Sequence, residues 1–122
     1  MFLKIKKINS DILLTDYTTQ FGETMTANGD LNNDGYDDIF VVGGFRNFSK
    51  LYRNNKDGTF RDITGISGIN IPFTTLTCGA AAADLDNDGD KDLIVTTSET
   101  DRNYLFENVN GYFRDITLNA GL

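Results

Sequence analysis

Two stretches of the chain repeat one acidic pattern, residues 30–38 and 84–92, and each leads directly into an apolar segment. In both, oxygen-bearing side chains stand at positions 1, 3, 5 and 9. A glycine stands at position 6, where it permits the positive φ that folds these oxygens around one centre. Hard divalent cations prefer such ligands. The pattern therefore predicts one calcium site in each loop.

The predicted ligands follow from the loop positions, with position 7 supplying only a backbone carbonyl. They are Asp30, Asn32, Asp34, Tyr36 and Asp38 in the first loop, and Asp84, Asp86, Asp88, Asp90 and Asp92 in the second. Nine of the 18 acidic residues fall within the loops, so their carboxylates repel one another unless a cation offsets them. Two calcium ions are the predicted cofactors.

Two simpler interpretations explain less. An Asp-Gly hairpin turn needs two residues, not a run of spaced carboxylates. A helix–loop–helix calcium motif needs a glutamate at position 12, where this chain has Val41 and Val95. The residues after each loop are β-branched and apolar, which favours strands. Magnesium fits less well, because it prefers a strict octahedron that retains several waters.

Composition narrows the function classes. The net charge is −7 and no basic stripe is present to neutralise phosphates, which argues against nucleic acid as a partner. Histidine is absent, which excludes a classical catalytic triad. No apolar run approaches the ~20 residues of a membrane span, and Lys4, Lys6 and Lys7 stand where a signal peptide needs an apolar core. Cys78, the single cysteine, is predicted to be a small buried residue.

The duplication extends well beyond the loops. Adding 54 to a residue number takes Asp30 to Asp84 and Leu51 to Leu105, and after a one-residue deletion an offset of 53 applies. A period near 50 residues indicates a repeat architecture. Four strands are expected in each copy, near 22–29, 38–43, 49–54 and 59–64, and near 78–84, 92–97, 103–108 and 112–117.

These repeats predict an all-β fold of two four-stranded antiparallel β-propeller blades plus an N-terminal strand. Blade 1 spans residues 20–74 and blade 2 spans residues 75–122. Residues 1–19 are predicted to be a strand segment of a neighbouring blade, with a disordered leader as the alternative.

The two loops and several short phrases resemble FG-GAP/VCBS repeats, from which integrin α-subunit propellers and many bacterial surface proteins are built. The phrases are Phe21-Gly22, Leu51-Tyr52-Arg53-Asn54, the run from Asp57-Gly58 to Asp62-Ile63-Thr64, and Ala120-Gly121-Leu122. The closing phrase is most similar to the branch that includes cartilage acidic protein. The resemblance implies a calcium-stabilised scaffold for protein interaction or adhesion, at an extracellular or cell-surface location.

Other functions remain open. Phe45, Phe48 and Tyr104 could present aromatic faces to sugars in a lectin-like module. A calcium-propeller lyase or hydrolase is the third alternative, but no nucleophile is paired with a base, so we expect no enzyme. Because a closed propeller has about 4–8 blades, the ring must be completed by missing sequence or by a head-to-tail homo-oligomer of three or four chains.

Overall fold

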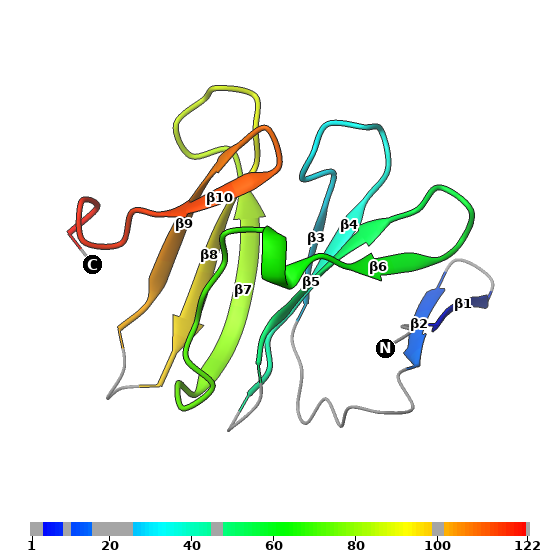
Figure 1. The fold of residues 1–122 in the computed structure, drawn as a ribbon, viewed down its shortest axis with the longest axis horizontal. Coiled ribbons are helices and arrows are strands. Elements are labelled where there is room, and N and C mark those ends of the chain that lie inside the picture. Colours follow the sequence, from blue (N-terminus) through cyan, green and yellow to red (C-terminus); the bar gives the residue numbers. More distant parts are fainter. Residues whose placement is uncertain (1–3, 9–10, 16–25, 45–47, 99–101, 122) are drawn as a thin grey trace.

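The computed structural model describes residues 4–8, 11–15, 26–44, 48–98 and 102–121, and side chains from residue 28 onward. Two four-stranded antiparallel sheets dominate it (Figure 1). The first contains β3 (Thr26–Gly29), β4 (Asp38–Val41), β5 (Lys50–Asn54) and β6 (Phe60–Asp62), in that order. The second contains β7 (Thr77–Ala83), β8 (Asp92–Thr97), β9 (Tyr104–Val109) and β10 (Tyr112–Asp115), again in chain order. The predicted pair of four-stranded meanders is confirmed.

Burial explains why the second strand of the first sheet is apolar on both faces. All four residues of β4 are buried, whereas β8 is fully buried on one face only, at Leu93 and Val95, with Ile94 partly buried and Thr96 exposed. A strand covered on both sides reads as a continuous apolar run, not as an alternating one. This is the environment of a strand inside a stack of sheets, and it agrees with the arrangement expected of propeller blades.

The first strand of the second sheet is built from very small side chains. Four alanines in a row are good helix formers, yet Ala80 to Ala83 pair in register with β8, down to Ala83 opposite Asp92. Strand β7 also lies beside β3, so the innermost strands of the two sheets are neighbours. Small residues allow this close approach.

One core joins the sheets to each other. Buried side chains of β4 and β5 share a cluster with those of β8 and β9, and Ala80 and Ala82 pack against its edge. The linker between the sheets contributes Ile69 and Ile71. The two blades therefore pack face to face through this common core.

Several details differ from the sequence prediction. The strand expected at 59–64 ends at Asp62, because Thr64–Ile66 form the short 3₁₀ helix η1. Cys78 is exposed, so the prediction that it is buried was wrong; its side chain leaves the β7 strand on the solvent side. The start of the strand expected at 22–29 lies partly outside the described residues.

The N-terminal segment contains two strands where one was expected. Strands β1 (Lys4–Ile8) and β2 (Asp11–Thr15) form a separate antiparallel hairpin. Asp11 begins β2, whereas Asp62 and Asp115 end the fourth strands of the blades. Whether the hairpin belongs to a neighbouring blade stays a prediction.

Candidate metal centres

The two acidic loops lie at the same end of the two blades. Residues 30–37 connect β3 to β4, and residues 84–91 connect β7 to β8. Figure 1 shows both loops projecting from one edge of the paired sheets. The glycines at position 6 have φ of 87° in Gly35 and 94° in Gly89. Position 4 is also left-handed, with φ of 58° in Asn33 and 61° in Asn87, a conformation that asparagine tolerates.

The second loop gathers three carboxylates. Oxygens of Asp84, Asp86 and Asp88 all lie within 4.8 Å of one another. Asp84 accepts hydrogen bonds from the backbone N–H groups of Asp88 at 3.1 Å and of Gly89 at 2.9 Å. Asp88 in turn accepts from the N–H of Asp90 at 2.8 Å. These bonds wrap the backbone around the side chains and hold the three carboxylates on one centre.

The first loop has the same hydrogen-bond pattern. Asp30 accepts from the N–H groups of Asp34 at 3.0 Å and of Gly35 at 2.7 Å. Asp34 accepts from the N–H of Tyr36 at 3.0 Å. Asn32 replaces the carboxylate of Asp86, and its carbonyl oxygen accepts from the N–H of Asp34 at 3.3 Å. The first loop therefore presents a similar ring of oxygens with one less negative charge.

The aspartates at position 9 have a structural role within their blades. Asp38 accepts from the backbone N–H groups of Leu31 at 3.0 Å and of Asn54 at 2.9 Å. Asp92 accepts from Leu85 at 2.9 Å and from Asn108 at 2.9 Å. Both carboxylates are buried, and each joins the start of its loop to the end of the third strand. A carboxylate retains lone pairs beyond two such bonds, so this geometry is compatible with a metal ligand.

At position 7 the side chains point to other partners. One carboxylate oxygen of Asp90 accepts from the backbone N–H of Asn110 at 3.0 Å, and the other accepts from the side-chain amide of Asn33. Tyr36 is half-exposed, and the ammonium group of Lys56 lies 5.4 Å from its ring centre. Any contribution of these two residues to a metal would come from the backbone carbonyl, as the sequence pattern predicts.

Negative charge accumulates in both loops. The pKa of Asp86 is raised by a partial loss of hydration within the loop and by the nearby carboxylates of Asp88 and Asp92. Burial also raises the pKa of Asp38, more than its two backbone N–H donors lower it. A divalent cation would relieve this crowding. The donor set, the oxygen spacing and the loop conformation thus fit a hard cation such as calcium.

The comparison with known families matches this geometry. Residues 30–95, more than half of the 122-residue chain, match a family model described as the FG-GAP-like repeat. The chain belongs to the FG-GAP-like repeat family. The predicted resemblance is thereby confirmed. No curated protein and no solved structure matches the chain at a significant level.

Family membership gives the loops and the blades a common context. FG-GAP-like repeats are often calcium-binding and are typical of extracellular or surface proteins. The matched segment contains both acidic loops and ends in β8. In the part of the chain that the structure describes, no helix has the length and apolar character needed to cross a bilayer.

The two FG-GAP loops are linked across the blade interface, which the sequence did not reveal. Asn108, with no exposed surface, donates its side-chain amide to the carbonyl of Leu31 at 2.7 Å and to that of Lys91 at 2.8 Å. Gly111 packs on Asn32, since a Cβ at Gly111 would lie 3.1 Å from the Asn32 Cβ. The first loop is therefore held in place by the second blade. The only indication of this contact in the sequence is that asparagine stands at equivalent positions of the two repeats, 54 and 108.

The Asp-Ile-Thr phrase of the FG-GAP repeat closes each sheet. Asp62 accepts from the N–H of Thr64 at 3.0 Å and from its hydroxyl at 2.7 Å, and that hydroxyl accepts from the N–H of Leu51 at 2.9 Å. Asp115 and Thr117 repeat the arrangement in blade 2. The phrase thus ends the fourth strand and ties it to the third.

Proposed function

We propose that this chain is a calcium-stabilised β-propeller module that acts as a non-catalytic scaffold for protein interaction or adhesion, outside the cell or at its surface. The observation that carries the proposal is the identical hydrogen-bond pattern of the two acidic loops. A bound cation in each would rigidify one end of the blades. The loops at the end of the blades opposite the acidic loops would then bind a partner protein.

Calcium should raise the stability of the fold. Each occupied site contributes about 2.7 kcal/mol when calcium exceeds its Kd 100-fold. We expect Kd values of about 10⁻⁴ to 10⁻³ M, as in extracellular modules, because no bidentate glutamate closes either loop. Thermal unfolding in chelator and in calcium up to about 100 mM, with calorimetric titration, measures both quantities.

Matched variants separate metal binding from general damage. Asp34→Ala and Asp88→Ala each remove one carboxylate from a loop and should each abolish one bound calcium. Asp57→Ala is the control, because its exposed carboxylate caps the turn before Thr59 without belonging to either loop. An unchanged melting temperature on adding calcium to the parent protein would rule out the metal assignment.

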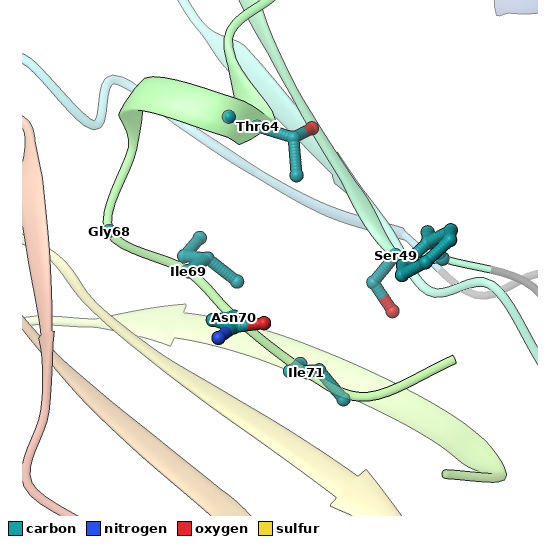
Figure 2. A pocket seen from close by; sticks show the side chains of 8 residues that line it. Ser49, Thr64, Gly68, Ile69, Asn70 and Ile71 are labelled. Carbon is teal, nitrogen blue, oxygen red and sulfur yellow. The ribbon is translucent and has the colours of Figure 1, made fainter. Parts of the chain in front are cut away.

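A hollow at the opposite end favours saccharide binding as a second candidate. It has a volume of about 340 Å³ and is lined by Phe48, Ile69 and Ile71 together with the polar side chains of Thr64 and Asn70 (Figure 2). The exposed ring of Phe48 beside the amide group of Asn70 suits one sugar ring.

The aromatic residues proposed to bind a sugar lie in different environments. Phe48 is 61% exposed, and its ring lies 5.8 Å from that of Phe73, so the two form a small aromatic surface beside the hollow. Tyr104 is stacked on Phe106 at the core and does not contribute. Phe45 lies outside the described residues. Glycan-array binding that is lost in Phe48→Ala and Asn70→Ala, with calcium stabilisation unchanged, would support this candidate.

A further inference from the structure

Blade 2 covers one face of blade 1 almost completely. The covered side chains have exposed fractions of 6% or less and belong to the core shared with blade 2; they are Leu31, Phe40, Leu51 and Ile63. Several hydrogen bonds join the two blades. The Asn108 amide donates to the carbonyl of Leu31 at 2.7 Å, and the N–H of Phe113 donates to the carbonyl of Ser67 at 2.8 Å.

The same face on blade 2 is open. Its members, by the repeat offsets, are Leu85, Ile94, Leu105 and Ile116. Leu85 is 51% exposed where Leu31 is 3% exposed, and the other three are only partly buried. By the repeat offset, Ser67 and Gly68 correspond to Ala120 and Gly121, which are exposed. Gly68 and Gly121 share a left-handed backbone, with φ of 87° and 78°. Blade 2 thus exposes the surface that blade 1 buries.

The existing interface specifies what can cover this surface. The occupant must present apolar side chains equivalent to Leu93, Val95, Phe106 and Phe113, an amide equivalent to that of Asn108, and an outward N–H on its fourth strand. Blade 1 has this set on its other side, at Ile39, Val41, Tyr52, Phe60 and Asn54. Strand pairing agrees, since Asn54 pairs with Phe60 as Asn108 pairs with Phe113.

We propose that the open face of blade 2 docks blade 1 of a second copy of this chain, repeating the interface within the chain. The Asn54 amide of that copy would donate to the Leu85 carbonyl, and its Phe60 N–H to the Ala120 carbonyl. Such head-to-tail contacts generate a closed ring when the rotation per chain divides a full turn, with three or four chains giving about six or eight blades. This inference rests on the proposed propeller module and names its partner.

Two features of the surfaces set the conditions for docking. Ile39, Val41 and Tyr52 are already buried within one chain, so the incoming copy must replace their present cover, and assembly should be slow and accelerated by warming. Docking also brings Asp37, the equivalent of Lys91, towards the carboxylates of the second loop. Calcium bound in that loop offsets this repulsion, so assembly should require calcium.

Native mass spectrometry and light scattering of the full chain, warmed and cooled in millimolar calcium, test the proposal. We expect a discrete ring that chelator dissociates. Leu85→Glu places a charge in the interface and should weaken assembly more than about tenfold. Ile66→Glu is the control, because Ile66 is 69% exposed on η1 and lies outside the docking face.

A cross-link keeps the test independent of folding defects in Leu85→Glu. A Cβ at Gly29 would lie 3.2 Å from the Lys91 side chain. By the repeat offset, Gly29 corresponds to Ala83 and Lys91 to Asp37, so docking would bring Ala83 of one copy close to Asp37 of the next. In a Cys78→Ser background, the double variant Ala83→Cys with Asp37→Cys should form disulfide-linked dimers and larger species on oxidation. Neither single-cysteine variant should form this series of linked species.

A monomer in calcium without intermolecular cross-links would overturn the docking proposal, and so would a ring unaffected by Leu85→Glu. Calcium-dependent melting of the same samples separates the two levels of inference. If the melting shift persists while assembly fails, the metal sites stand and the docking partner is wrong. If both are absent, the proposed function fails as well.

Discussion

At the scale of single residues, Asn108 makes the most informative contacts. Its amide donates to carbonyls of both blades, and its own carbonyl accepts from the N–H of Gly111 at 2.8 Å. Among the residues that the structure describes, Asn54 contacts its own blade only, donating to the Asp37 carbonyl and accepting from the N–H of Lys56. The two asparagines therefore differ by one contact between blades.

Asn108→Ala should cost about 2–3 kcal/mol of unfolding free energy, because it leaves the buried carbonyl of Leu31 and the partly buried carbonyl of Lys91 without this donor. The matched variant Asn54→Ala removes the corresponding turn contacts at a more exposed site and should cost about 1 kcal/mol. Urea unfolding of both variants measures the difference. Equal costs would show that the contact between blades contributes little.

At the scale of elements, the Asp62–Thr64 closure of blade 1 makes stability depend on pH. Burial acts to raise the pKa of Asp62, but the hydrogen bonds from Thr64 and the ammonium group of Lys50, at 3.2 Å, outweigh it, so the pKa is lowered. An aspartate with a lowered pKa in the folded state stabilises the fold above its unfolded pKa of about 3.9. That contribution is lost as the pH falls through the folded pKa.

Asp62→Asn removes the charge and keeps one oxygen for Thr64. At pH 7 the variant should be less stable than the parent by about 1 kcal/mol or less, since the ion pair is partly exposed and screened. The difference should shrink as the pH is lowered from about 5 to 2. Chemical unfolding across this range provides the curve. If the difference in unfolding free energy between parent and variant did not change with pH, it would come from altered hydrogen-bond geometry and not from the charge of Asp62.

The elements show how much the sequence can predict. The positions of the strands followed from the repeat, because turn residues and apolar runs recur at a fixed offset, and this decided that Ala80 to Ala83 form a strand against their helix propensity. The acidic loops were also predictable, since their chemistry is local. The contact of Asn108 with Leu31 joins residues 77 positions apart, and no local pattern indicates it. The second N-terminal strand was missed because that segment does not repeat.

At the scale of the whole molecule, the two blades share one core and one pair of linked loops. Phe40 and Leu51 of blade 1 belong to the same buried cluster as Phe106 and Phe113 of blade 2. The first loop also reaches blade 2 directly, through the bond from Asn33 to Asp90. Separating the blades would expose this apolar core, so the chain should unfold in one step.

Calcium in the first loop should therefore protect both blades. In Asp88→Ala, where only the first loop remains complete, saturating calcium should raise the melting temperature in a single transition and slow amide exchange in β9, around Phe106 and Asn108, as well as in β4. The physical reason is linkage: a ligand that binds only the folded state stabilises every element that unfolds with its site. In Asp34→Ala, where only the second loop remains complete, calcium should likewise protect β4 together with β9, because both belong to the same core. Two separate transitions, or protection confined to blade 1, would show that the blades unfold independently despite their common core.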